Sequence, residues 1–348
     1  MKRLFLLAIL LLAACSPKTP PTASAEPQTI TVMTHDSFAV SEDLVRSFEE
    51  TNNAKIVFLP GGDAGAVLNK AVLTKDAPLA DVLFGVDNTF LSRALEAEIF
   101  ASYASPELNN IPDPFQLDPS NYALPVDYGD VCINYDKAFF AEAGLSVPQS
   151  LEDLTRAEYA NLLVVENPAT SSTGLAFLMA TIAHFGDDYL DYWRALKANG
   201  VVVVDGWETA YYTSFSGSSG RGPQPMVVSY GTSPAAEVIF AETPLDTSPT
   251  ASILGPGTCF RQIEFVGILK KTQNRALAEK FVDFMLSKQF QEDMPMQMFV
   301  YPVNSNAALP AEFVKYAQTS DQPATLAPDV IAAKRDRWIQ EWTDVVMK

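Results

Sequence analysis

Short apolar runs alternate with amphipathic stretches along most of the chain, and the two have different periods. Apolar runs bounded by turn-forming residues are typical of buried β-strands, and positions 29–33 (TITVM) and 55–59 (KIVFL) have this form. Between them, Ser41 precedes a stretch in which Leu44 and Phe48 fall on one helical face. The pattern predicts a strand–helix–strand unit at the start of the folded body.

The same alternation continues to the C-terminus and predicts an α/β fold with largely parallel sheets. Further predicted strands are 81–85, 123–127, 131–135, 162–165, 201–204, 226–229 and 262–269. Helical patterns include 88–95 and a final amphipathic helix with Trp338, Trp342 and Val346 on one face. Between two of the strands, Tyr128-Gly129 is interpreted as a break.

The first residues have the pattern of an export signal. Lys2 and Arg3 precede the apolar run 4–12, which is too short to span a bilayer. Positions 12–15 (LAAC) match the site at which a lipoprotein signal is cleaved before an acylated cysteine. We therefore expect a signal peptide at 1–14 and, at 15–28, a lipidated Cys15 followed by a flexible proline-rich tether. The protein is expected to be extracytoplasmic, in the periplasm or at the cell surface, with its lipid anchor in a membrane.

Charge and cysteine content narrow the class of partner. Without Lys2 and Arg3, the 24 basic residues fall to 22 against 42 acidic ones, a formal charge of −20. Such acidity argues against a nucleic-acid partner, because phosphate backbones are bound by basic patches. Two cysteines, Cys132 and Cys259, remain in the body, and their spacing suggests no structural metal site. We expect no cofactor and a monomer.

Five loops that follow predicted strands are rich in polar side chains. Their ranges are 34–38 (THDSF), 61–65 (GGDAG), 86–88 (VDN), 167–174 (NPATSSTG) and 229–234 (SYGTSP). Parallel strands end in loops that bind ligands at their carboxyl ends, although a single polar loop also caps a helix. Five such loops favour a ligand-binding cleft.

The residues in these loops resemble a known family. The segments THDSF, GGDAGAVLNK, ADVLFGVDN, PVDYG, NPATSSTG, DGWETAYY, VVSYGTSPA, RQIE and VYPV, in this order, look like those of the thiamine-binding solute receptors of bacterial ABC transporters. The resemblance implies a type II periplasmic-binding protein fold, in which crossing hinge strands join two α/β lobes. Lobe 1 would comprise 29–127 and 266–348, and lobe 2 would comprise 128–265. The crossing strands would bring Cys132 near Cys259, either as a disulfide or as two buried free thiols.

The resemblance also implies a ligand, a partner and a set of binding residues. Thiamine or a thiamine phosphate would be captured between the lobes and passed to the ABC permease subunits, without catalysis. The expected ligand-binding residues are His35, Asp36, Asp63, Asp87, Ser171, Trp207, Tyr230 and Thr232, with Asp127 as a further acidic candidate. Asp63 is the first choice for an acidic contact with the thiazolium cation, although it also suits a helix N-cap. Trp207 and Tyr230 would stack on the rings.

A further expected role is the binding of the phosphate group of a thiamine phosphate. Ser171 precedes a helix, where free N–H groups and the helix dipole would favour a phosphate. Two positions depart from the family, because His35 stands where tyrosine is typical and Ala236 lacks an aromatic ring found in some relatives. These departures leave open a thiamine fragment or a different cation.

Two alternatives remain at this stage. A ferric-iron receptor of the same fold could use His35, Asp63, Tyr211, Tyr212 and Tyr230, since Fe³⁺ prefers phenolate, carboxylate and imidazole ligands. A thiamine-cleaving enzyme could use Cys132 as nucleophile with Glu264 as base. A serine hydrolase fits less well, because the chain has two histidines and no GxSxG motif.

Overall fold

The computed structural model describes residues 26–217 and 222–348. The predicted signal peptide, Cys15 and the tether up to residue 25 lie outside the described residues. Within the described part of the chain, no helix combines the length and the apolar character needed to cross a membrane.

The strands and helices alternate as the sequence predicts. The strands are β1 (Gln28–Thr34), β2 (Ala54–Pro60), β3 (Val82–Asp87), β4 (Phe100–Ala101), β5 (Leu124–Asp136), β6 (Leu163–Glu166), β7 (Val202–Val204), β8 (Met226–Tyr230), β9 (Thr250–Ile253), β10 (Phe260–Leu269) and β11 (Tyr301–Pro302). The helices are α1 (Glu42–Asn52), α2 (Ala64–Leu73), α3 (Leu91–Glu96), α4 (Lys137–Ala143), α5 (Ser172–Phe185), α6 (Tyr189–Ala198), α7 (Ser233–Ile239), α8 (Arg275–Leu286), α9 (Lys288–Gln297), α10 (Ala311–Tyr316) and α11 (Pro328–Val346).

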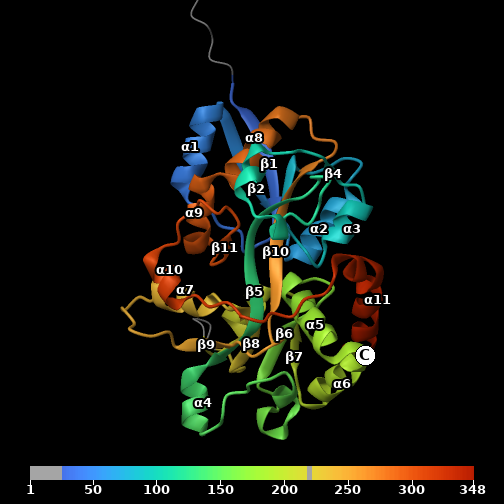
Figure 1. Cartoon of the computed structure of the whole chain (residues 1–348), viewed down its shortest axis with the longest axis vertical. Helices are drawn as coiled ribbons and strands as arrows, with labels where there is room; N and C mark the ends of the chain where they lie inside the picture. The colour runs from blue at the N-terminus through green and yellow to red at the C-terminus, as the bar shows by residue number, and fades with distance from the viewer. Residues whose placement is uncertain (1–25, 218–221) are drawn as a thin grey trace, which may run out of the picture.

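Two strands run through both halves of an elongated molecule. The sheet order is β2-β1-β3-β10-β5-β8-β6-β7, with β4, β9 and β11 paired beside this path. The outer strands are parallel to their neighbours, whereas β10 is antiparallel to both β3 and β5. Figure 1 shows β5 and β10 side by side, descending from the half that holds α1 and α8 to the half that holds α4 and α6. These are the crossing strands that connect the two halves.

The predicted break at Tyr128-Gly129 is wrong, because β5 is continuous through it. A Cβ atom on Gly129 would lie 2.9 Å from Cδ1 of Tyr230, closer than two carbon atoms pack. Glycine is therefore needed here for the close approach of a ring to the strand and not for a turn. The residue fixes how near Tyr230 can lie to the crossing strands.

Apolar faces of the helices cover the sheet in both halves. In the first half Phe48 of α1 packs edge-on against Phe281 of α8, with ring centroids 5.5 Å apart. Ser41 is the N-cap of α1 by position, but its hydroxyl makes no capping hydrogen bond. Its backbone N–H instead donates to the distant carboxylate of Asp293 at 2.9 Å. In the second half α5 is buried from Ser172 to Ile182 and forms the centre of the core.

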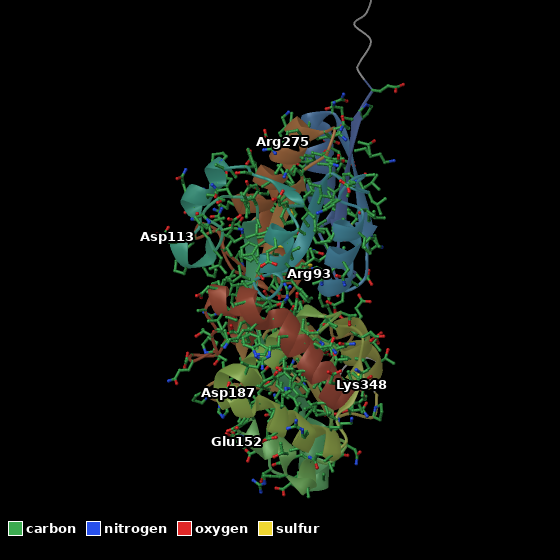
Figure 2. All side chains as sticks on the ribbon, turned by 90° about the vertical axis from the view of Figure 1, so that its right-hand side faces the viewer. Arg93, Asp113, Glu152, Asp187, Arg275 and Lys348 are labelled. Atoms are coloured by element: carbon green, nitrogen blue, oxygen red, sulfur yellow. A yellow bond between two sulfur atoms is a disulfide. The ribbon has the colours of Figure 1, made fainter. Side chains whose placement is uncertain are left out.

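The final helix touches both halves of the molecule, whereas the expected lobe boundaries assign it to the first. Near its start the guanidinium of Arg335 lies 5.8 Å from the ring centroid of Phe90, which precedes α3. Further along, Trp342 packs edge-on against Trp193 of α6, with centroids 5.4 Å apart. Figure 2 faces this helix, which runs from below Arg93 down to Lys348. The segment before it also crosses over, since α10 packs on α7.

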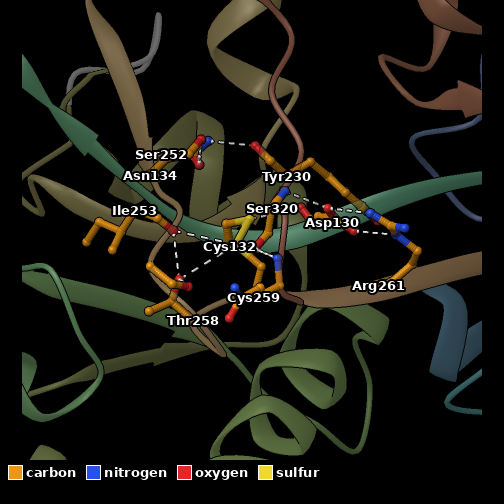
Figure 3. The surroundings of a disulfide bond; sticks show 12 residues. Asp130, Cys132, Asn134, Tyr230, Ser252, Ile253, Thr258, Cys259, Arg261 and Ser320 are labelled. Carbon is orange, nitrogen blue, oxygen red and sulfur yellow. Dashed lines mark hydrogen bonds and ion pairs between the residues drawn. A yellow bond between two sulfur atoms is a disulfide. The ribbon is translucent and has the colours of Figure 1, made fainter. Parts of the chain in front are cut away.

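A disulfide and an ion pair fasten the lower part of the crossing strands (Figure 3). Cys132 of β5 and Cys259, which directly precedes β10, are bonded, and their Cα atoms lie 4.3 Å apart. Two residues earlier on β5, Asp130 accepts hydrogen bonds from Nε and an Nη of Arg261 at 2.8 and 3.0 Å. The backbone N–H of Ser320 donates a third bond to this carboxylate at 2.8 Å. The proximity implied for the cysteines is confirmed.

Candidate functional site

A cavity of about 700 Å³ lies between the two halves, a size suited to a small organic ligand. Its walls come from the loop after β1 (35–39), the start of α2 (62–64 and 66), the start of α5 (170, 172 and 173), the segment 205–209 with 211 and 212, β8 and α7 (230, 233 and 236), Glu264 of β10 and the connection between α9 and β11 (297–300). Four of the five polar loops therefore converge, as parallel strand ends should.

The structure separates the predicted ligand-binding residues into two groups. The residues that line the cavity are His35, Asp36, Asp63, Trp207 and Tyr230. The residues that are fully buried beside it, outside its wall, are Asp87, Asp127, Ser171 and Thr232.

Asp63 joins the two sides of the cavity. As the N-cap of α2 it accepts a hydrogen bond from the backbone N–H of Ala64 at 2.6 Å. Its other oxygen accepts from the backbone N–H of Trp207 at 3.0 Å, and the N–H of Ser172 lies 3.4 Å from the first. Burial raises the pKa of Asp63, and these N–H donors oppose the rise. The capping role and a place in the cavity wall thus coexist.

Four aromatic rings form one side of the cavity. The indole of Trp207 stacks on Tyr211, with centroids 5.2 Å apart and planes 18° apart. Tyr212 and Tyr230 meet the same indole edge-on at 5.5 and 6.3 Å. The indole N–H donates to Oγ of Ser229 at 2.8 Å, which fixes the ring orientation. Tyr211 and Tyr212 belong to a π-helical turn, η6 (Thr209–Ser214), that the sequence pattern did not reveal.

Asp87, the last residue of β3, is held away from the cavity by hydrogen bonds to the turn that precedes α3. One oxygen accepts from the backbone N–H groups of Thr89 and Phe90 and from the hydroxyl of Thr89. The other accepts from the side-chain amide of Gln262, whose oxygen receives the phenol of Tyr230 at 2.6 Å. Burial raises the pKa of Asp87 to about 6, against the effect of these donors. Asp87 therefore positions Tyr230 through Gln262.

The start of α5 supplies hydroxyl groups, but through neighbours of the predicted residue. Ser171 is the N-cap by position, yet its hydroxyl bonds the hydroxyl of Thr173 at 2.9 Å inside the protein. Thr170, Ser172 and Thr173 line the cavity instead. Thr232 similarly stands at the start of α7, and its buried hydroxyl has no hydrogen-bond partner among the residues that the structure describes.

Carboxyl groups gather on the side formed by the crossing strands. Glu264 of β10 lines the cavity, and one of its oxygens lies 3.5 Å from Nε2 of His35. Burial lowers the pKa of His35 to about 4, while nearby Asp36 opposes this effect, so the imidazole is neutral above that pH. Burial also raises the pKa of Glu264, and the neighbouring charges of Asp127 and Asp87 raise it further.

The sequence reasoning missed the connection between α9 and β11. Gln297, Met298, Phe299 and Val300 line the cavity, and Phe299 has a positive φ of 55°. The ring of Phe299 packs edge-on against Phe240 at 5.0 Å. The segment VYPV enters the sequence analysis only as part of the resemblance, and three of the four lining residues, Met298, Phe299 and Val300, have apolar side chains that do not signal a binding role.

The thiamine-cleaving alternative loses its key residue in this geometry, whereas the ferric alternative keeps its residues. Cys132 is fully buried, lies outside the cavity wall and is joined to Cys259, so the nucleophile needed by a thiamine-cleaving enzyme is absent. For ferric iron, the five residues named as possible ligands, His35, Asp63, Tyr211, Tyr212 and Tyr230, all line the cavity, so a binding test with iron decides this alternative. Among the described residues, no group of three His, Cys, Asp or Glu side chains is arranged to hold a metal ion.

Comparison with known proteins agrees with this geometry. The family described as bacterial extracellular solute-binding protein matches residues 77–321. The thiamine-binding periplasmic protein of Salmonella typhimurium is 32% identical over 92% of this chain and 94% of its own length, and that of Escherichia coli is 31% identical over the same shares. A solved periplasmic thiamin binding protein is 28% identical, with a TM-score of 0.82 over 94% of this chain and 99% of its own. The predicted type II periplasmic-binding fold is confirmed.

Proposed function

The chain belongs to the bacterial extracellular solute-binding protein family, and from this premise we propose that it captures thiamine or a thiamine phosphate outside the cytoplasm and delivers it to an ABC permease. The family and the relatives' names support capture of a solute for transport. The choice of thiamine rests on those relatives and on the chemistry of the cavity wall.

The observation that carries the proposal is the ring cluster around Trp207. Thiamine presents a permanently cationic thiazolium ring and a flat aminopyrimidine. Trp207 and Tyr230 expose rings to the cavity, and carboxyl groups of Asp63 and Glu264 line the same space. An aromatic face contributes roughly 0.5 to 2 kcal/mol to a bound cation, and a nearby carboxylate contributes more. The wall thus combines flat surfaces with negative charge, as this ligand requires.

The start of α5 is the place proposed for a phosphate. Thr170, Ser172 and Thr173 line the cavity there, and a helix N-terminus favours an anion. The carboxyl group of Asp63 already lies at this terminus. The difference between the affinities for thiamine and for thiamine monophosphate therefore measures how strongly the carboxylate of Asp63 opposes a phosphate bound beside it.

The test is calorimetric titration of the purified protein after bound ligand has been removed by unfolding and refolding. Thiamine, thiamine monophosphate, thiamine diphosphate, a neutral hydroxymethylpyrimidine and ferric citrate are titrated in parallel. We expect one-to-one binding of a thiamine compound without turnover. Absence of binding by every thiamine compound, together with a coloured ferric complex, would replace the proposal by iron capture.

A variant pair locates the site. Trp207→Ala removes the central ring and should weaken thiamine binding about 30-fold, equivalent to about 2 kcal/mol. Tyr122→Ala changes an exposed ring outside the cavity wall and should leave affinity unchanged. Equal affinities for the two variants would place the ligand elsewhere.

Membrane attachment through Cys15 is the second part of the proposal, supported by the LAAC sequence before the proline-rich tether. Acylation would keep the receptor beside its permease. Expression of Cys15→Ser should release the protein into the soluble exported fraction, with thiamine binding unchanged. Retention of this variant in the membrane fraction would contradict the anchor.

A further inference from the structure

Two buried carboxyl groups face each other where the crossing strands pass the cavity. Asp127 of β5 and Glu264 of β10 are direct partners in the strand register, and the two residues are 0% and 5% exposed. Within the described part of the chain, neither oxygen of Asp127 has a hydrogen-bond partner other than the carboxyl group of Glu264 beside it. Two ionised carboxylates in this position would repel each other. A proton shared between them would remove the repulsion and would supply the hydrogen-bond donor that neither carboxylate otherwise has.

Only Glu264 of the two reaches the cavity wall. Asp127 lies behind it, and β11 covers the other side of this part of β5 through the pairing of Pro302 with Asp127. Glu264 is therefore the face of the pair that a ligand can touch, and Asp127 is its buried partner.

The titratable groups around the pair supply no positive charge. The groups that face it are His35 after β1, Asp63 at the start of α2, Asp87 at the end of β3 and Tyr230 of β8. Among the described residues that line the cavity, none is lysine or arginine. The nearest guanidinium along β10, that of Arg261, is bonded to Asp130.

From these contacts, and resting on the proposed capture of thiamine, we infer that Glu264 is the counter-charge for the cationic ring and that the Asp127–Glu264 pair releases one proton when the cation binds. Before binding, the pair holds one proton and one negative charge. The ligand brings one positive charge, the proton leaves to solvent, and the pair carries two negative charges beside the cation. Charge and protons balance in this exchange.

The direction of the pKa shifts agrees with the geometry. Burial raises the pKa of Asp127 to about 7 and raises that of Glu264 well above its ordinary value. The two groups titrate as a unit, so the proton belongs to the pair and not to one residue. His35 cannot take the place of the ligand's charge near neutral pH, because burial holds its pKa at about 4.

The measurement is calorimetry of thiamine binding in buffers of different ionisation enthalpy, from pH 6 to pH 9. We expect release of about one proton per ligand below the upper pKa of the pair, and an affinity that rises up to about tenfold per pH unit there and then levels off. The neutral hydroxymethylpyrimidine should bind without proton release. Thiamine binding with no proton release at any pH would overturn this inference and leave the proposed function intact, whereas no thiamine binding would overturn both.

Two isosteric variants separate the roles of the pair. Glu264→Gln removes the counter-charge, so affinity for thiamine should fall at least about tenfold and proton release should stop. Asp127→Asn removes one of the charges that oppose ionisation of Glu264, so thiamine should still bind and proton release should be confined to a lower pH range than in the unmodified protein. Similar pH profiles for Asp127→Asn and the unmodified protein would contradict the inference.

The control is Glu166→Gln. Glu166 is another buried acid with a raised pKa, but it lies outside the cavity wall. Proton release should persist in this variant. If it stopped there as well, buried acids in general would be the source and the assignment to Asp127–Glu264 would fail. The proton count in the unmodified protein tests the inference even if one variant does not fold.

Discussion

Asp127 and Asp130 stand three residues apart on the same strand, both are fully buried, and they have opposite surroundings. Asp130 accepts two bonds from Arg261 and one from the backbone of Ser320. Asp127 has no basic or N–H donor among the described residues, and its register partner is another acid, Glu264. The protein therefore balances the charge of Asp130 with its own donors, whereas a positive charge to balance Asp127 and Glu264 has to come from a ligand.

The difference divides the crossing strands into two parts. In the fastened part, around Asp130 and Cys132, bonds join β5 to β10, and in the receptive part, around Asp127 and Glu264, the two strands face the cavity. Below the cavity, the ion pair and the Cys132–Cys259 bond join β5 to β10 (Figure 3). Beside the cavity, the same two strands carry an acid pair with one member in the wall. A buried charge is costly without a partner, so an uncompensated acid pair in a cavity wall is a signature of a cationic ligand.

The largest effect should come from the fastened part. Replacing both Cys132 and Cys259 by serine removes a cross-link between residues 127 positions apart and should lower the free energy of unfolding by about 4 kcal/mol. Denaturant unfolding measures this, and thiamine titration serves as the control because neither cysteine lines the cavity. A loss below about 1 kcal/mol would contradict the fastening role.

Arg261→Ala should follow, because it leaves the charge of Asp130 buried with one backbone donor. Breaking a buried pair in this way costs about 3 kcal/mol. Arg156→Ala, which breaks the exposed pairs with Asp153 and Glu158, is the matched control and should cost less than about 1 kcal/mol. Equal losses in the two variants would remove the distinction between a buried and an exposed pair.

Asp127→Asn should act in the opposite direction, as a stabilising change in the ligand-free protein. The pKa of Asp127 is raised to about 7 in the folded state, so the folded protein loses stability as pH rises from about 4 to about 7. The asparagine has no such loss, and its advantage should already reach roughly 2 kcal/mol at pH 6. Urea unfolding from pH 4 to pH 8 tests this, and a difference independent of pH would refute it.

His35→Gln should give the smallest effect, on the acid side. Burial lowers the pKa of His35 to about 4, so the unfolded chain takes up the proton first as pH falls from 6.5 and the folded protein loses stability down to about pH 4. The variant lacks this loss and should gain about 1 kcal/mol relative to the unmodified protein between pH 7 and about pH 5.5. Parallel melting curves at the two pH values measure the difference, which should be absent if the imidazole is solvated.

Much of the fold follows from apolar periodicity, because most strands and the final helix are runs whose burial is local information. The continuity of β5 through Gly129 does not follow, since a glycine needed for close contact with Tyr230 cannot be told from a glycine in a turn by sequence alone. The neighbours of α11 do not follow either. Its apolar face predicts that it packs on something, whereas the contacts with Phe90 and Trp193 depend on how distant segments fold.

The candidate site was predictable at the level of loops and less so at the level of side chains. The loops that hold Asp63 and Trp207 do converge on the cavity. Asp87 accepts hydrogen bonds from the N–H groups of Thr89 and Phe90 instead of reaching the cavity. The sequence alone does not show whether an aspartate at the end of a strand bonds the following turn or a ligand. At the start of α5, one position separates the inward hydroxyl of Ser171 from cavity-lining Ser172, which is finer than sequence spacing resolves.

The strand order has a consequence for how the chain assembles after export. β10 (Phe260–Leu269) lies between β3 and β5, so these two strands, which are separated along the chain only by α3, the two-residue strand β4 and short turns, do not pair with each other. A chain that emerges from its N-terminus can form the β1–β2 and β1–β3 pairs early, but the sheet stays open at β3 until β10 has left the export channel. Completion of the first half therefore waits for nearly the whole chain, and folding should be slow compared with that of a domain built from local contacts. Until then the edges of β3 and β5 are unpaired, and this interval is when the protein is most exposed to aggregation and proteolysis.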